Sequence, residues 1–294
     1  MPLLTSDLRM PSHAKINLGL YVLGKRPDGY HDIWTIFQEL EFHDVLYFTK
    51  RDAPLTLTTN HPTLPVGDEN LVCRAARAFA QKTGCPTQLA IHLEKQIPLG
   101  AGLGGGSSNA AAALCGLNQL FQVGASREEL AALGATLGSD VPFFLHGGTA
   151  IGTGRGEQIE PMPDLPPCWI LLINPRIHVS SAWAYKNINL KLTNFPTKNN
   201  VFSQQHNAVT DALRTLENML EEPVISHYPI IASIKNLLLE EGAEWASMSG
   251  SGSTVFGVFK EKELAEQALR QIERPDWLLV VTSFHQRTSS PAHA

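Results

Sequence analysis

The chain has 294 residues, of which 43% are apolar and 17% charged, a composition typical of a folded protein of about two domains and not of a disordered one. Its 23 basic and 28 acidic residues give a net charge of −5 without a run of like charge. This balance argues against bulk electrostatic binding to nucleic acid or to an anionic membrane. A phosphorylated ligand would therefore have to be held by local geometry.

Targeting and membrane signals are missing from the sequence. The first residues have neither a basic start nor a long apolar stretch, so no signal peptide is predicted. Residues 96–126 carry no charge, but Pro98 and seven glycines make a lipid-facing helix unsuitable there. Four cysteines, at 73, 85, 115 and 168, form no CxxC pair, and we expect reduced thiols in a cytoplasmic protein. The histidines, among them His13, His43 and His285, show no metal-ligand spacing, so no metal site is predicted.

The first half of the chain is expected to be rich in strands. Residues 12–23 alternate, which predicts a half-buried strand with Lys15 and Asn17 side by side on one face. A turn is expected at 24–30, strands at 33–40, 45–49, 55–59 and 89–93, and a helix at 70–82. Ser126 and Glu129 form a capping box for a helix that ends at Gly138, and 147–156 are expected to be a Gly-rich connection.

A different pattern begins after residue 157, where we place a domain boundary that divides the chain into 1–157 and 158–294. Strands are expected at 169–173, 244–249, 254–259 and 277–283, with helices at 201–220, 229–241 and 261–272. With one extra helix set aside, the order is β-α-β-β-α-β, a split βαβ sandwich.

Residues 97–109 are expected to be a strand, a glycine loop and the start of an Ala-rich helix opened by Ser or Asn. Six of the nine residues from Pro98 to Gly106 are glycine or alanine, which lets backbone amides approach a ligand closely. Free N–H groups and the helix dipole favour an anion at the following helix start, and phosphate fits best.

Other glycine-loop families fit less well. No Gly-Lys-Ser or Gly-Lys-Thr ends the run, which excludes a Walker loop. Residues 100–105 align with a dinucleotide GxGxxG, but Leu120 stands where an acidic residue is needed. The His-Arg-Asp and Asp-Phe-Gly segments of protein kinases are also missing.

Residues 98–111 resemble the phosphate loop of the GHMP superfamily, which contains galactokinase, homoserine kinase, mevalonate kinase and phosphomevalonate kinase. The triple glycine before Ser-Ser-Asn-Ala-Ala narrows the match, as do residues 14–18, 26–31, 137–144 and 249–256, in the family's order. Together they resemble the branch of the superfamily that acts in the non-mevalonate isoprenoid pathway. One departure is Ala208 after Asn207, where the family usually has Asp, so residue 208 is given no role.

This resemblance implies an α+β fold of two domains, an N-terminal domain like ribosomal protein S5 domain 2 and a ferredoxin-like C-terminal domain. It also implies ATP-dependent phosphorylation of the 2-hydroxyl of a cytidylyl-linked methylerythritol, with Mg²⁺ held mainly by the nucleotide phosphates and by a hydroxyl such as that of Ser107 or Ser108. The expected partners are these small molecules, without nucleic acid or membrane.

The resemblance also implies roles for individual residues. Asp140 would accept the proton of the attacking hydroxyl with the assistance of Lys15. The acceptor would be bound by Asn17, Tyr30, His31 and Tyr185, and a second glycine motif with Gly250 and Gly252 would lie against the phosphate loop. The residues expected to bind ATP are Pro98, Leu99, Gly100, Ala101, Gly102, Leu103, Gly104, Gly105, Gly106, Ser107, Ser108, Asn70 and Lys95.

Two alternatives stay open at this point. One is another small-molecule kinase of the same superfamily. The turn at Tyr30 and His31 and a measured preference for cytidine would distinguish the two kinases. The other is a non-enzymatic nucleotide-binding or regulatory protein, against which Lys15 and Asp140 argue.

Overall fold

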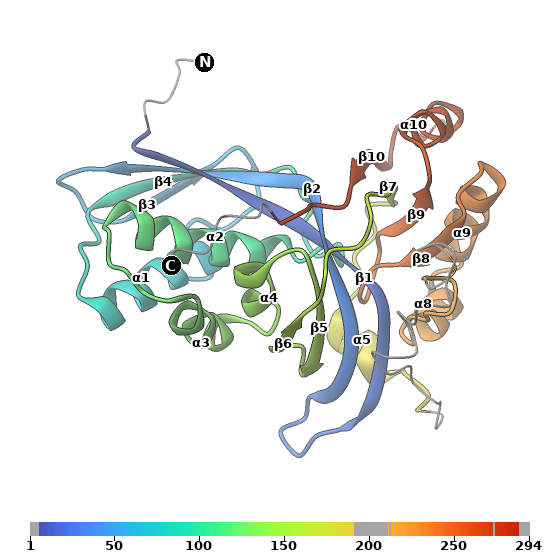
Figure 1. Cartoon of the computed structure of the whole chain (residues 1–294), viewed down its shortest axis with the longest axis horizontal. Helices are drawn as coiled ribbons and strands as arrows, with labels where there is room; N and C mark the ends of the chain where they lie inside the picture. The colour runs from blue at the N-terminus through green and yellow to red at the C-terminus, as the bar shows by residue number, and fades with distance from the viewer. Residues whose placement is uncertain (1–5, 191–210, 212, 273, 288–294) are drawn as a thin grey trace.

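A long antiparallel hairpin of two strands runs through the centre of the structure (Figure 1). The computed structural model describes residues 6–190, 211, 213–272 and 274–287. In the hairpin, β1 (Leu8–Lys25) pairs with β2 (His31–Lys50), and the two strands expected at 33–40 and 45–49 are one continuous strand. Residues 14–22 of β1 are all buried, so the strand is covered on both faces and not on one as its alternation suggested.

The remaining strands complete a six-stranded sheet in the order β3-β4-β2-β5-β6, with β1 beside β2. They are β3 (Thr56–Thr59), β4 (Leu89–Glu94), β5 (Thr149–Gly154) and β6 (Gln158–Pro161). The expected Gly-rich connection at 147–156 was wrong, because most of it is β5, paired with β2. Gly152 is needed there since a Cβ would lie only 2.4 Å from the Phe37 ring.

Four helices lie together on one side of this sheet (Figure 1). They are α1 (Leu71–Thr83), α2 (Gly105–Leu120), α3 (Arg127–Leu137) and α4 (Val141–His146). The Ser126 capping box and the end of α3 at Gly138 are confirmed. The expected Ser or Asn cap of α2 was wrong: Gly104 is the N-cap with φ 68°, a left-handed conformation that favours glycine. The short strand expected before the glycine loop is also absent, since residues 95–104 of the described chain are turn and loop.

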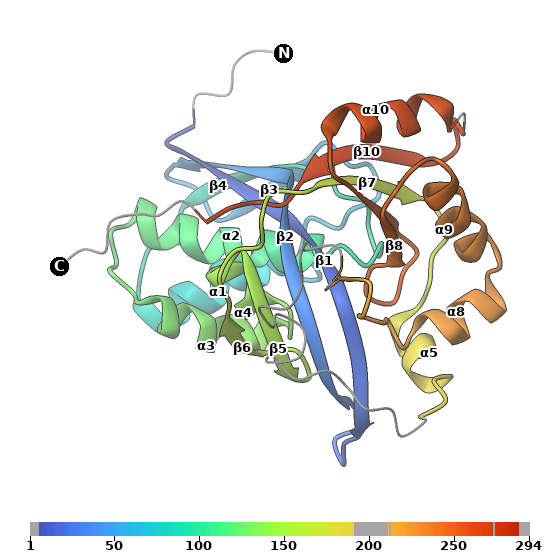
Figure 2. The same cartoon turned by 45° about the vertical axis from the view of Figure 1, so that its right-hand side comes forward.

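The second sheet has the order β10-β7-β9-β8, which confirms the split βαβ pattern. Its strands are β7 (Trp169–Asn174), β8 (Trp245–Met248), β9 (Val255–Phe259) and β10 (Leu278–Ser283). Helices α9 (Ile230–Glu240) and α10 (Lys262–Gln271) pack on it (Figure 2), and α5 (Ser181–Lys186) and α8 (Glu221–His227) are two short helices that the sequence did not predict.

The helix expected at 201–220 falls largely outside the described residues, which also exclude Asn207 and Ala208. Of its described residues, 211 and 213 are helical as expected, but residues 214–220 form turns, loop and a β-bridge and not a helix. There the Asn218 side chain donates hydrogen bonds of 2.8 Å to the carbonyls of Met248 and Gly250, and its backbone bridges to Leu20. This segment therefore ties β1 to the loop that follows β8.

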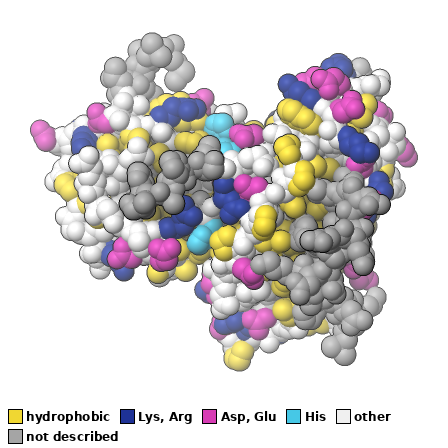
Figure 3. Space-filling view, in the orientation of Figure 1, with side chains coloured by type: hydrophobic (Ala, Val, Ile, Leu, Met, Phe, Trp, Pro, Cys, Tyr) yellow, Lys and Arg dark blue, Asp and Glu magenta, His cyan; other side chains and the backbone are white. Residues whose placement is uncertain are grey.

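One hydrophobic core spans both sheets, with side chains from β1, β2, β7 and β9 in contact. The boundary near residue 157 stays a prediction, and the pairing of β6 with β5 favours a position between Pro161 and Trp169. On the face shown in Figure 3, charged side chains of both signs are interspersed. Among the described residues, no helix is both long and apolar enough to cross a membrane.

Candidate active site

The glycine loop is held between β1 and the segment 249–254. The Lys15 amide donates to the Leu103 carbonyl at 3.0 Å, and the Ser249 hydroxyl donates to the Gly102 carbonyl at 2.8 Å. At Gly102 a Cβ would lie 2.1 Å from the Ser249 carbonyl oxygen, so only glycine allows this approach. The second glycine motif thus packs directly on the first, with Gly250 facing Lys15 and Asn17.

The loop leads into the N-terminus of α2, where backbone N–H groups have no partner within the helix and can bind an anion. Among the residues that the structure describes, a Cβ at Gly106 would meet only Leu71, at 3.7 Å, which leaves room beside this first turn. Ser107 is partly exposed there. Ser108 is buried, and its hydroxyl accepts a 2.8 Å hydrogen bond from Ser12. Of the two serines, Ser107 is therefore the one open to a ligand.

Lys95 and Asn70 have structural contacts in this fold. Lys95 Nζ lies 2.5 Å from the Asp44 carboxylate, and both side chains are almost completely buried. Asp44 also accepts hydrogen bonds from the amides of Gln96 and Ile97, just ahead of the loop. Burial lowers the pKa of Lys95, and the charge of Asp44 opposes that shift. Asn70 caps α1 through Val72.

Three side chains meet beside the glycine loop: Lys15, Asn17 and Asp140. Their spacing along β1 predicted that Lys15 and Asn17 lie side by side. Lys15 Nζ donates to Asn17 Oδ1 at 2.5 Å and lies 3.6 Å from Asp140 Oδ2. Lys15 is only 4% exposed, so it is not a solvated strand residue. Burial lowers the pKa of its ammonium, and the neighbouring Asp140 carboxylate opposes that shift.

Asp140 occupies the N-cap position of α4, but among the described residues its side chain makes no capping hydrogen bond. The carboxylate is 29% exposed and faces the Lys15 ammonium. It therefore has a cationic partner on one side and an open approach on the other, the arrangement that a group receiving a proton needs.

Three aromatic residues lie farther along the hairpin and α5. The His31 and Tyr185 rings face each other, with centroids 5.4 Å apart and planes inclined by 20°. Burial raises the pKa of the Tyr185 phenol, and the charge of Asp140 adds to the rise. Tyr30 is 58% exposed, and its ring stacks on the Arg155 guanidinium at 5.1 Å, not on His31.

Several of these contacts could not be found from the sequence. Thr35 accepts a 2.7 Å hydrogen bond from Asn17 Nδ2 and so orients the amide that receives Lys15. Arg155 reaches Tyr30 across the sheet. Both residues were missed because no motif marks them, and only the pairing of β2 with β5 brings Arg155 near.

Comparison with known proteins gives the family. The chain matches the GHMP kinases N terminal domain at residues 70–148 and the GHMP kinases C terminal model at 201–275. A 4-diphosphocytidyl-2-C-methyl-D-erythritol kinase of Pelobacter propionicus is 41% identical over 94% of this chain and 98% of its own length. One of Geobacter metallireducens is 42% identical over 93% and 97%. The chain belongs to the 4-diphosphocytidyl-2-C-methyl-D-erythritol kinase family of GHMP kinases.

Solved structures agree with this family and its two-domain α+β fold. A crystal structure of 4-(cytidine 5'-diphospho)-2C-methyl-D-erythritol kinase has a TM-score of 0.78 at 32% identity, over 95% of this chain and all of that one. Homoserine kinase from Cytophaga hutchinsonii, at 18% identity, has a TM-score of 0.71 over 97% and 96%, and shares the fold alone. Membership of this kinase family makes the chain a phosphotransferase with an alcohol acceptor that uses ATP, and it removes the non-enzymatic alternative.

Proposed function

We propose that this kinase transfers the γ-phosphoryl group of ATP to the 2-hydroxyl of 4-diphosphocytidyl-2-C-methyl-D-erythritol in the non-mevalonate isoprenoid pathway. The names of the relatives support the substrate. The observation that carries the chemistry is the buried Lys15 ammonium, 3.6 Å from Asp140 and beside the glycine loop. We further propose that the chain has two domains, which meet between Pro161 and Trp169, and that it works in the cytoplasm without nucleic-acid or membrane partners.

Asp140 is proposed to accept the proton of the attacking hydroxyl. Its carboxylate makes no capping hydrogen bond to α4 among the described residues and lies 3.6 Å from the Lys15 ammonium. The Lys15 ammonium donates a hydrogen bond to the acceptor oxygen as charge develops there, while Asn17 and Thr35 fix its direction. Phosphoryl transfer through a loose transition state depends mainly on positioning the acceptor oxygen and on neutralising charge.

The nucleotide phosphates are proposed to lie on the residues from Pro98 to Ser107, at the start of α2. Mg²⁺ would neutralise phosphate charge, and the Ser107 hydroxyl is the loop oxygen whose partial exposure fits such a role. Lys95 and Asn70, expected to touch the nucleotide, are now proposed to act through the loop and α1 that they hold in place.

The cytidine is proposed to bind beside Tyr30, His31 and Tyr185. A base between two rings needs two stacking distances of about 3.5 Å each, about 7 Å in all. The His31 and Tyr185 centroids are 5.4 Å apart, so the gap must widen by more than 1 Å to admit a base. The ring of Tyr185 would then stack on the base, a contact worth about 1–3 kcal/mol.

An acceptor panel tests the proposal. ATP consumption is measured with the cytidylyl substrate, free methylerythritol, homoserine, galactose and mevalonate. We expect turnover with the first alone, because the free polyol lacks the nucleotide that the aromatic residues would bind. Tyr185→Ala should raise KM for the cytidylyl substrate by roughly tenfold and leave KM for ATP nearly unchanged. Comparable turnover of free methylerythritol would refute the cytidine pocket and favour another acceptor.

A further inference from the structure

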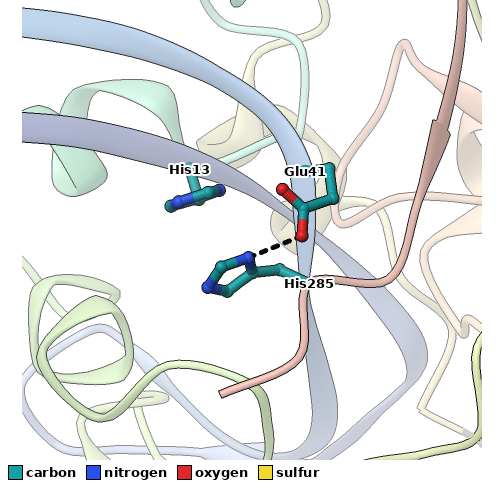
Figure 4. Close-up of side chains that lie close together, drawn as sticks. All are labelled: His13, Glu41 and His285. Carbon is teal, nitrogen blue, oxygen red and sulfur yellow. Dashed lines mark hydrogen bonds and ion pairs between the residues drawn. The ribbon is translucent and has the colours of Figure 1, made fainter. Parts of the chain in front are cut away.

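A cluster of ligating side chains lies outside the active site, where the chain's end meets the hairpin. It consists of His13 from β1, Glu41 from β2 and His285 from the segment after β10 (Figure 4). One ligating atom from each residue lies within 4.8 Å of the others. His285 Nδ1 is 2.9 Å from Glu41 Oε1, and the His13 and His285 rings are stacked with centroids 4.0 Å apart.

The hydrogen bonds of the cluster leave lone pairs for a ligand. His13 Nδ1 is 2.8 Å from the Leu40 carbonyl, which can only accept, so Nδ1 carries the hydrogen and Nε2 carries the lone pair. A backbone carbonyl holding Nδ1–H in this way is the usual support of a metal-binding imidazole. His43, whose ring is 5.1 Å from that of His13, is oriented in the same manner by the Glu41 carbonyl. Burial, with His285 and His43 close by, lowers the pKa of His13 to about 4.

We propose that His13, Glu41 and His285 bind one divalent transition-metal ion of the Zn²⁺ class. Two imidazoles and a carboxylate are ligands that suit Zn²⁺, Co²⁺ or Ni²⁺ better than Mg²⁺. Bonds of about 2.0–2.1 Å place tetrahedral ligands about 3.3 Å apart, so the present atoms need to close by about 1.5 Å at most, within reach of side-chain rotation. Water completes the four ligands.

The surroundings favour entry of a cation. Glu41 is 51% and His285 24% exposed, so an ion reaches the cluster from solvent. The Glu39 carboxylate interacts with His285 and Glu41 and so adds an acidic group beside the cluster, whereas Asp164, farther out, is paired with Arg287. The site is independent of the proposed reaction, since none of its ligands belongs to the active site.

The ion would fasten the end of the chain to the hairpin that carries Lys15. The Phe284 backbone already bridges to Leu40, and the His285 amide donates to the Glu39 carbonyl at 2.9 Å. A metal bridging three segments of the folded chain binds the native state alone, so it should raise the melting temperature.

The test uses the full chain without an affinity tag, freed of metal with a chelator and titrated with Co²⁺. We expect one bound Co²⁺ per chain with the visible absorption of tetrahedral cobalt, its displacement by Zn²⁺, and a rise in melting temperature with Zn²⁺. His285→Ala and Glu41→Gln should each weaken Co²⁺ binding at least about tenfold. His92→Ala, a histidine on β4 outside the cluster, is the matched control and should bind as the wild type does. Failure to bind Co²⁺, or equal affinity in all four proteins, would overturn the proposal.

Discussion

Replacement of Asp140 by Asn removes one charge from the active site and keeps the size of the side chain. The Asp140 carboxylate makes no capping bond to α4 among the described residues, so α4 itself should not depend on it. Its attraction to Lys15 across 3.6 Å is about 4–5 kcal/mol at an effective dielectric constant of about 20, an upper limit because the carboxylate is 29% exposed. Because Lys15 stays buried in the variant and loses its counter-charge, the free energy of unfolding should fall, but by no more than this amount.

The same substitution should strongly slow catalysis. Loss of the proton acceptor should lower kcat by ~10²–10⁴, and without the carboxylate the pKa of Lys15 should fall further. Steady-state kinetics, nucleotide binding by calorimetry and a melting curve separate these effects, and ATP affinity should hardly change. Asp7→Asn, at an exposed residue just before β1, is the charge-matched control and should keep wild-type turnover. A kcat near that of the wild type in Asp140→Asn would show that this carboxylate is not the base.

Three further predictions concern the surroundings of this pair. Lys15→Met should abolish turnover without loss of stability at neutral pH, because it removes a buried ammonium. The lysine loses its proton at a lower pH in the folded chain than in the unfolded chain, where its pKa is 10.5. Between those two pKa values the wild type should therefore gain stability relative to the variant as the pH rises, which melting curves would show. Gly106→Val should raise KM for ATP about tenfold with little change in melting temperature, since only Leu71 is near; an unchanged KM would place the phosphates elsewhere. Lys95→Met should lower the free energy of unfolding by about 3–5 kcal/mol in denaturant titrations, because it leaves the buried Asp44 carboxylate without its cation, and Lys95→Met with unchanged stability would contradict the structural role given to this pair.

Local patterns in the sequence were enough for most of the elements. Period-two alternation predicted β1 and placed Lys15 and Asn17 on one face, and the Ser126 capping box marked the start of α3. The short helices α5 and α8, of six and seven residues, were missed because they are too short to show a helical period. The Gly-rich β5 was missed since glycine indicates a turn unless a bulky neighbour such as Phe37 requires it.

The chemistry of the site depended on the family resemblance. Without that resemblance nothing in the sequence pairs Asp140 with Lys15, and only the fold brings the two within 3.6 Å. Contacts between distant residues left no local signal: Lys95 meets Asp44 across 51 positions, and His285 meets Glu41 across 244. Spacing along the chain could not reveal them, because strand pairing and domain packing create them.

The position of the new phosphate tests the central claim most directly. In 4-diphosphocytidyl-2-C-methyl-D-erythritol the 2-hydroxyl is tertiary, since its carbon carries the methyl group and no hydrogen. A phosphate transferred by this kinase to that oxygen should give a phosphomonoester signal without proton coupling in the phosphorus NMR spectrum of the purified product, with the two diphosphate signals retained. A monoester signal split into a doublet or a triplet would place the phosphate on a secondary or primary hydroxyl and contradict the proposed reaction.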